Sequence, residues 1–447
     1  MTYRISGLFF VFFVLLQACS PAHLISIQAK QDLLGQPDLQ GAHVGISVYD
    51  PERRQYLYNY QGDRYFVPAS NTKLFSLYAG MKYLGDSLSG VAYLENDTAL
   101  FVIPAGDPSI LHPDFARQPV IDLLKKVKKN IYLCDINWKE EPLGAGWSWD
   151  DYNDSYMAER SPMPLYGNVI HWVEEKQKQS NQDQDFAASP SVYSIPEIDW
   201  KVRFSADTLK KFHVQRSRDD NIYEITQGSE KYMVQDVPFV THGLESALQL
   251  LRDTVGTHIY LVRRIPMPQT AGMKVIHTQP ADSVFIPMMH YSNNFFAEQT
   301  LLMASWARLG YMNDAGIIDT LLATDLRGLP QKPSWVDGSG LSRYNLFTPQ
   351  DFVWLLDHMM QTFGIQRMKT ILPTGGQGTL SSYYKQDSGA IYAKTGSLSD
   401  VLALSGYLYT KKNRLLLFSI MVNNHQGHPG AIRKDFEKFL LALRNNN

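Results

Sequence analysis

The stretch from Pro68 to Lys73, Pro-Ala-Ser-Asn-Thr-Lys, constrains this chain most, because an apolar run follows it as far as Leu84. Such a run predicts a buried helix. Ser70 and Lys73 then share one face of that helix, because residues three apart are neighbours on a helical surface. An amine that burial keeps neutral can take the proton of a serine hydroxyl, so the pair predicts a nucleophile that forms an acyl-enzyme.

The Ser-x-x-Lys pattern alone is weak, because the chain contains it a second time at Ser382 and Lys385. A motif this short is more often chance than chemistry. The second copy has no long apolar helix behind it and lies shortly before Lys394. We interpret it as a surface turn or a short helix.

The composition is that of a globular protein with more than one domain, since 447 residues are 44% hydrophobic and 19% charged. With 42 basic and 44 acidic side chains and no basic run, the sequence argues against a nucleic-acid partner. Its histidines are scattered, and the close pair His425 and His428 lacks the Cys or Glu of a zinc site. We therefore expect no metal.

The N-terminus indicates export. One positive charge, Arg4, precedes an apolar run over residues 7–16 that is too short to span a bilayer. The run ends in Leu-Gln-Ala-Cys, which resembles the cleavage box of bacterial lipoproteins and makes Cys19 the lipid-bearing residue. We expect a signal peptide over 1–18, a tether over 19–30, and a periplasmic protein that meets the membrane through its lipid anchor alone.

Ordinary signal cleavage near Ala18 is the alternative, because Gln17 replaces the small residue usual in that box. The chain has one other cysteine, Cys134, so no internal disulfide is available to the mature protein if Cys19 is lipidated. Cys134 lies in an apolar stretch and is expected to be a buried small hydrophobe.

The periodicity of the chain predicts a mixture of helices and strands. A hairpin at a sheet edge is expected first, and a polar loop is expected over 176–185. The predicted strands are 41–49, 55–60, 100–103, 130–135, 258–262, 402–409 and 415–422, and the predicted helices are 119–128, 244–252, 295–303 and 432–443.

Two further motifs occur once each: Ser-x-Asn at Ser292 to Asn294, and Lys-Thr-Gly at Lys394 to Gly396. With Ser70 and its lysine they stand in the order used by penicillin-binding proteins and serine β-lactamases. Ser339 is not a competing nucleophile, because Asp337 occupies the first glycine position of the Gly-x-Ser-x-Gly elbow.

The chain resembles the D-alanyl-D-alanine carboxypeptidase/endopeptidase family of penicillin-binding protein 4 (DacB), peptidase family S13, over most of its mature length. The 222 positions between Ser70 and Ser292 leave room for the inserted domains of that family. The matching motifs are Pro68-Ala69-Ser70-Asn71-Thr72-Lys73, Gly106-Asp107-Pro108-Ser109, Ser292-Asn293-Asn294 with Ala297-Glu298, Asp337-Gly338-Ser339-Gly340-Leu341-Ser342-Arg343 and Gly378-Thr379-Leu380.

The resemblance implies an α/β (α+β) fold of the serine β-lactamase/DD-peptidase (transpeptidase) type. An antiparallel sheet flanked by helices would carry a large mixed α/β insertion. We expect the catalytic domain over 31–88 and 277–447, and an inserted region over 89–276 made of two small accessory domains.

The expected reaction is acyl transfer in two halves. Ser70 would attack the carbonyl between two D-alanines of a peptidoglycan stem peptide, with Lys73 as the base for acylation. Ser292 would relay a proton to the leaving amine, and Asn294 would hold the amide side of the substrate. Lys394 would supply the positive field that keeps the first lysine neutral and attracts the terminal carboxylate.

By resemblance, Thr395, Gly396 and Ser397 form the substrate-binding strand, and Thr395 and Ser397 bind the terminal carboxylate. The backbone N–H groups of Ser70 and Ser397 would form the oxyanion hole. β-Lactams would be acylating inhibitors, and no cofactor is required. The sequence leaves open which lysine is the general base.

Two other functions remain open. One is a penicillin-binding receptor or scaffold that acylates and hardly turns over, and the other is a β-lactamase or esterase. The long insertion and the lack of an obvious Glu-bearing deacylation loop disfavour the β-lactamase and esterase. The sequence does not decide between carboxypeptidase and endopeptidase, nor does it name the third residue of the stem peptide.

Overall fold

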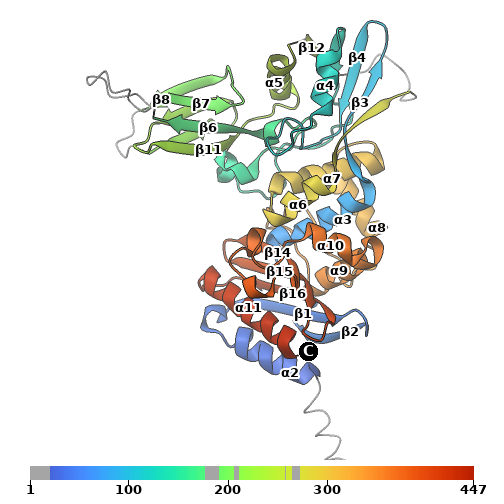
Figure 1. Cartoon of the computed structure of the whole chain (residues 1–447), viewed down its shortest axis with the longest axis vertical. Coiled ribbons are helices and arrows are strands. Elements are labelled where there is room, and N and C mark those ends of the chain that lie inside the picture. Colours follow the sequence, from blue (N-terminus) through green and yellow to red (C-terminus); the bar gives the residue numbers. More distant parts are fainter. Residues whose placement is uncertain (1–20, 177–190, 206–210, 257, 264–271, 447) are drawn as a thin grey trace, which may run out of the picture. The chain divides into compact units, whose positions relative to one another are not determined.

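The structure is a computed structural model that describes residues 21–176, 191–205, 211–256, 258–263 and 272–446 (Figure 1). The described chain forms two compact units. The first unit contains residues 21–78, 285–292 and 318–446, and the second contains 79–284 and 293–317.

The first unit is built on a five-stranded sheet in the order β14-β15-β16-β1-β2, in which every neighbouring pair is antiparallel. The predicted hairpin is confirmed as β1 and β2, and β2 lies at one edge of this sheet. The opposite edge is β14, which carries the Lys-Thr-Gly motif. The strands are β1 (His43–Asp50), β2 (Gln55–Tyr60), β14 (Ile391–Leu398), β15 (Val401–Tyr409) and β16 (Leu415–Asn423).

Helices cover both faces of this sheet, which explains why β15 and β16 are apolar almost without interruption. On one face, α9 (Pro349–Phe363) packs on β1, β15 and β16. It begins with a capping box in which Thr348 and Asp351 satisfy each other's backbone N–H groups. This unit also contains η2 (Pro37–Leu39), α10 (Ile365–Ile371), η7 (Gly378–Leu380) and η8 (Lys385–Asp387).

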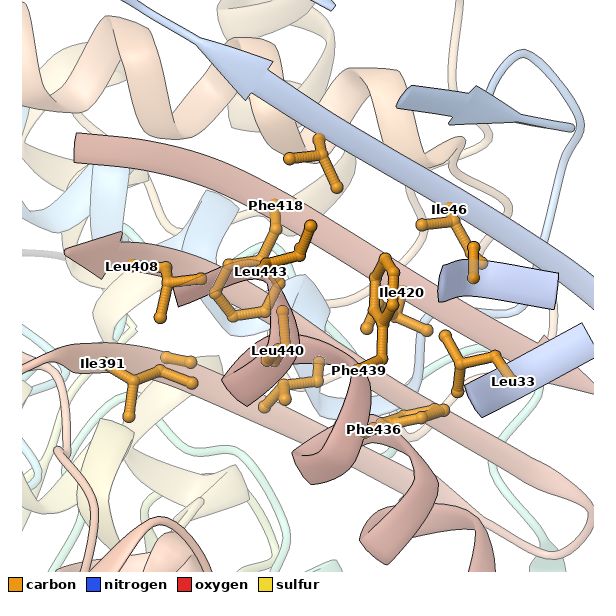
Figure 2. Packing of buried hydrophobic residues seen from close by; sticks show 14 of the residues in the cluster. Leu33, Ile46, Ile391, Leu408, Phe418, Ile420, Phe436, Phe439, Leu440 and Leu443 are labelled. Atoms are coloured by element: carbon orange, nitrogen blue, oxygen red, sulfur yellow. The ribbon is translucent and has the colours of Figure 1, made fainter. Parts of the chain in front are cut away.

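The other face carries α11 (Pro429–Asn446), the predicted C-terminal helix. Figure 2 shows its Phe436, Phe439 and Leu443 packed against side chains of the sheet, among them Phe418 and Ile420. Burial of this apolar stripe attaches the last helix of the chain to its central strands.

The expected tether over 19–30 is wrong for its described part. Helix α2 (Pro21–Ala29) and a following helical turn (Lys30–Leu34) occupy it, and they pack on α11. Ile25, Ala29 and Leu33 are at most 2% exposed and belong to the same core as α11. These residues repeat every fourth position, so they form one helical stripe. The exposed apolar neighbours Leu24 and Ile27 obscure that stripe in the sequence.

The second unit contains a five-stranded mixed sheet in the order β12-β5-β4-β3-β13, with α4 and α5 contributing to its core. Two three-stranded sheets, β8-β10-β9 and β11-β6-β7, complete the strands of this unit. Its elements are β3 (Ser87–Glu95), β4 (Ala99–Pro104), α4 (Pro119–Lys126), β5 (Asn130–Leu133), η4 (Trp149–Asn153), η5 (Ser155–Met157), η6 (Tyr166–Asn168), β6 (Val169–Glu175), β7 (Ser191–Ile195), β8 (Lys201–Ser205), β9 (His213–Arg216), β10 (Ile222–Thr226), β11 (Tyr232–Pro238), α5 (Glu245–Val255), β12 (Ile259–Leu261), β13 (Lys274–Pro280) and α7 (Asn294–Leu309).

The limits of these two units differ from the predicted domain limits at residues 89 and 276. Three of the four boundaries fall inside helices, namely α3 (Lys73–Tyr83), α6 (Asp282–His290) and α8 (Asp314–Ala323), and the fourth lies between Ser292 and Asn293. Helix α7, which follows the Ser-x-Asn motif, groups with the second unit. The interpretation of 89–276 as two accessory domains stays a prediction.

Three smaller expectations can be compared with the structure. Ser382 and Lys385 are exposed in a turn and at the start of η8, so the second Ser-x-x-Lys is a surface feature as predicted. Cys134 is buried and unpaired, as predicted. Most of the loop predicted over 176–185 lies outside the described residues. Within the described chain, no helix is long and apolar enough to cross a membrane.

Candidate active site

Ser70 lies in a tight turn at the entrance to a helix. The short 3-10 helix η3 (Ala69–Thr72) leads directly into α3, and Ala69 has a φ of 48°. This left-handed conformation is uncommon for a residue with a side chain and is a form of strain that recurs at functional sites. The turn is held by Asn71, whose side chain donates to Ser405 Oγ on β15 at 2.8 Å. The half-buried Ser70 hydroxyl is thus fixed by the sheet as well as by its helix.

Lys73 is fully buried, and its amine lies 2.9 Å from Ser70 Oγ. The amine also donates a hydrogen bond of 2.7 Å to the carbonyl oxygen of Ser339. The structure therefore brings together the serine and the lysine that the sequence paired. An amine within hydrogen-bond distance of a hydroxyl is in the position that a general base must occupy.

The loop around Ser339 orients Lys73, a role that the sequence analysis missed. The buried Asp337 carboxylate accepts hydrogen bonds from Gly340 N at 2.8 Å and Ser342 N at 2.7 Å. Gly340 has a φ of 82°, and a Cβ on it would lie 1.9 Å from the Ala69 carbonyl oxygen. Asp337 thus holds the loop in a conformation that presses against the Ser70 turn and directs the Ser339 carbonyl toward Lys73. The glycines and the aspartate were visible in the sequence, but their target was not.

The second lysine, Lys394, is fully buried on the edge strand β14. Its amine donates to Ser292 Oγ at 2.9 Å and to the Thr395 carbonyl oxygen at 2.7 Å. Ser292 itself has a φ of 58°. The structure thus places Ser292 against Lys394, and a proton relay through Ser292 would begin from this contact.

Burial lowers the pKa of Lys394 well below its ordinary value, and the nearby charge of Lys73 lowers it further. The sequence hypothesis assigned the positive charge of the site to Lys394. The surroundings oppose that charge, because burial disfavours the ammonium form of Lys394 and the charge of Lys73 repels it. The site therefore disfavours protonation of both lysines at the same time. A lysine amine that is not protonated can accept a proton.

Gly396 allows β14 to lie directly against the Ser70 turn. A Cβ at this position would be 2.5 Å from the Pro68 carbonyl oxygen and 3.2 Å from the Ala69 Cβ. Its neighbours Thr395 and Ser397 are half-buried and exposed, respectively. Thr395 lines a hollow between β14 and α11, and Ser397 Oγ accepts a 2.8 Å hydrogen bond from Arg433 on that helix. The proposed oxyanion N–H groups, those of Ser70 and Ser397, stay a prediction.

Asn294 belongs to the second unit, unlike the other site residues. Its side chain donates to the Tyr156 carbonyl oxygen at 3.0 Å. Asn293 is the cap of α7, because its Oδ1 accepts from Phe296 N at 2.9 Å. The middle residue of the motif therefore serves as a helix cap, while the role of Asn294 toward substrate stays a prediction.

The Gly106 to Ser109 motif has a structural role within the second unit. Asp107 is fully buried, accepts from Ser109 N at 2.8 Å and receives a hydrogen bond from Thr278. Burial raises the pKa of this carboxyl group. The Gly106 carbonyl oxygen accepts from Gln299 on α7 at 2.8 Å. The motif therefore links β4, β13 and α7.

Acyl transfer to a serine activated by a buried lysine is the chemistry that this geometry serves, and it defines an active-serine hydrolase. Comparison with known proteins gives the family. Residues 27–443 match the D-Ala-D-Ala carboxypeptidase 3 (S13) family, and the chain belongs to that family. It is a serine-type D-Ala-D-Ala carboxypeptidase, as the sequence resemblance implied.

Curated relatives extend over most of the chain. The D-alanyl-D-alanine carboxypeptidase of Actinomadura sp. (strain R39) is 27% identical and aligns with 91% of this chain and 83% of its own length. The D-alanyl-D-alanine carboxypeptidase DacB of Haemophilus influenzae is 23% identical over 86% of each chain. The crystal structure of penicillin-binding protein 4 (dacB) from H. influenzae superposes with a TM-score of 0.72, covering 94% of this chain and 98% of that one at 20% identity. The expected fold is confirmed.

Gly396→Ala tests the close contact between β14 and the Ser70 turn. We expect acylation of Ser70 by penicillin to slow by about 10²-fold, because a displacement near 1 Å at a reacting centre has an effect of that order. The free energy of unfolding should fall by about 1–3 kcal/mol from overpacking. Labelling with a fluorescent penicillin, quenched at a series of times, measures the acylation rate.

Gly430→Ala is the matched control, because it adds the same methyl group within α11, where the nearest atoms are those of the His428 side chain at 3.1 Å and no backbone atom lies close. An acylation rate in Gly396→Ala equal to wild type would show that β14 does not need this approach.

Lys394→Met tests the lowered pKa of Lys394. The unfolded chain keeps this lysine protonated up to about pH 10.4, whereas the folded protein releases the proton at lower pH. Wild-type stability must therefore rise with pH between the folded and the unfolded pKa. We expect the unfolding free energy of wild type minus that of Lys394→Met to increase from about pH 7 to about pH 9.5 in urea titrations.

Lys434→Met, at an exposed position of α11, controls for the loss of one positive charge. A difference between wild type and Lys394→Met that stays constant with pH would mean that Lys394 keeps its proton in the folded state.

Proposed function

We propose that Ser70 is the residue through which this enzyme forms its acyl-enzyme with peptidoglycan stem peptides ending in D-Ala-D-Ala. The observation that carries the proposal is the 2.9 Å contact between Ser70 Oγ and the buried amine of Lys73. In acylation, Ser70 Oγ bonds to the carbonyl carbon between the two D-alanines while its proton passes to a lysine amine. The carbon–nitrogen bond then breaks, and the departing amine of D-alanine takes up a proton.

The route of that second proton runs through Ser292. Its hydroxyl accepts from Lys394 at 2.9 Å, so it can hand its own proton to the leaving amine and recover one from the lysine. Water then attacks the ester on Ser70, and the same groups return the proton to the serine. Asn294 would hold the amide side of the substrate.

β-Lactams are proposed to acylate the same serine. Among solved structures with this fold, penicillin-binding protein 4 from H. influenzae is described in complex with a β-lactam, and Bd3459 from Bdellovibrio bacteriovorus is described as acylated by penicillin G. Opening of the β-lactam ring leaves the ring nitrogen attached, so the inhibitor cannot depart as D-alanine does.

The substrate of this family lies in the cell wall, so the protein acts outside the cytoplasm. We propose that Cys19 carries a lipid anchor, because the apolar run of the signal segment ends in Leu-Gln-Ala-Cys. Two or more acyl chains on one residue are enough for stable attachment to a membrane.

Mass spectrometry of the mature N-terminus tests the anchor. We expect the first residue to be a lipidated Cys19, and Cys19→Ala should release the protein from the membrane fraction. An unmodified terminus, at Cys19 or at another residue, would contradict the proposal.

The acyl-enzyme is tested by labelling with fluorescent penicillin and by following D-alanine release from intact stem peptides. Ser70→Ala should lose both signals, and Lys73→Ala should slow acylation by roughly 10²- to 10⁴-fold, the usual contribution of a general base. Ser382→Ala, in the surface copy of the motif, is the control and should behave as wild type.

A label on Ser382, or one that persists in Ser70→Ala, would overturn the assignment of the nucleophile. Release of one equivalent of D-alanine followed by arrest would instead support a receptor that acylates without turnover.

A further inference from the structure

We infer that Arg433 of α11 is a specificity-determining residue that binds the terminal carboxylate of the substrate together with Ser397. The inference rests on the proposed function, since it names a further contact for the substrate of that site. It concerns a residue outside the three motifs, on a helix that the sequence analysis treated only as packing.

Arg433 lies over the edge strand that carries the Lys-Thr-Gly motif. Its Nη2 donates to Ser397 Oγ at 2.8 Å. Arg433 and Thr395 both line the hollow between α11 and β14. Ile432 and Phe436 are 0% and 2% exposed, so the backbone beside Arg433 is anchored in the core. A guanidinium held by a fixed helix can keep a defined position above β14.

Two of the three other basic residues of α11 have acidic partners, unlike Arg433. Lys438 pairs with Asp32 at 2.8 Å, and Arg444 pairs with Asp387 at 2.7 Å. These are structural ion pairs that tie the helix to its neighbours. No acidic side chain in the described part of the chain forms such a pair with Arg433, which has a serine hydroxyl as its partner. A positive charge is therefore left to be matched by a carboxylate from elsewhere.

The chemistry of the pair suits a carboxylate. The hydroxyl of Ser397 accepts from Arg433 and keeps its own proton free to donate to a second acceptor. The guanidinium offers further N–H groups in a planar fork that matches the two oxygens of a carboxylate. A carboxylate beside β14 can thus receive donors from both residues at once.

The charge of Lys394 does not make this contact redundant. That amine is buried and donates to Ser292 and Thr395, and its surroundings disfavour protonation. The guanidinium of Arg433, by contrast, lies beside the exposed Ser397 of β14 and donates to its hydroxyl. It can supply to a carboxylate at β14 the positive charge that the sequence hypothesis assigned to Lys394.

The substrate class follows from this. The site would favour peptides whose terminal D-residue has a free α-carboxylate, and β-lactams with a free ring carboxylate. Ligands in which that carboxylate is amidated or esterified would lose the contact with Arg433.

The experiment compares diacetyl-L-Lys-D-Ala-D-Ala with its C-terminal carboxamide in wild type, Arg433→Ala, Arg433→Lys and Lys434→Ala. We expect Arg433→Ala to lower kcat/KM for the free acid by about 10- to 100-fold, the usual range for a charge-assisted hydrogen bond. The carboxamide should be hydrolysed at an unchanged rate, so that the preference for acid over amide falls. Arg433→Lys should restore part of the preference, and Lys434→Ala should match wild type.

Acylation by benzylpenicillin and by its methyl ester gives a second readout that needs no turnover. The preference for the free acid should fall in Arg433→Ala by a similar factor. If Arg433→Ala slows acylation by the acid and by the ester equally, Arg433 has a structural role only. If it slows neither reaction, Arg433 does not contact the carboxylate. Either result overturns the inference while the acyl-enzyme on Ser70 stands, whereas wild type that neither acylates nor hydrolyses overturns the proposed function and this inference with it.

Discussion

The burial of two lysine side chains close to each other is the constraint on which the candidate active site depends. Lys73 and Lys394 are both fully buried, and each is held by hydrogen bonds to a serine hydroxyl and a backbone carbonyl. Burial of one ammonium group is costly, and burial of two is costlier. Protonation of both amines at once is therefore disfavoured. The hydrogen bonds to the neighbouring serines and carbonyl groups hold the two amines in place.

Backbone proximity gives the site its geometry. The Ser70 turn is pressed between β14 and the Ser339 loop, and Gly396 and Gly340 stand where any side chain would collide with it. Strained conformations at Ala69 and Ser292 add to this picture. Rigid packing of this kind lets an enzyme position reacting atoms before substrate arrives. It explains why these two positions are glycines although neither has a side chain that could take part in the reaction.

Sequence reasoning found the elements whose signal is local. Ser70 and Lys73 are three residues apart on a helix, and the hairpin and C-terminal helix have clear periodicity. It failed where the contact joins residues far apart in the chain. The Ser339 carbonyl accepts a hydrogen bond from Lys73, which lies 266 positions earlier. Arg433 on α11 donates a hydrogen bond to Ser397 on β14. The supposed tether is a helix because three small or apolar residues, Ile25, Ala29 and Leu33, find a partner in α11. Such effects depend on tertiary contacts that one segment cannot reveal.

Strand order in the first unit has a consequence for the time at which the protein becomes active. β1, near the beginning of the chain, is paired with β16, in a register that joins His43 to Asn423. The strand that completes one side of Ser70, β14, also comes late in the sequence. A chain that crosses a membrane from its N-terminus onward therefore carries an unpaired first strand until almost all of it has emerged, and pairing over such sequence separations is slow. The surroundings of Ser70 are therefore complete only when the late strands of the chain are in place.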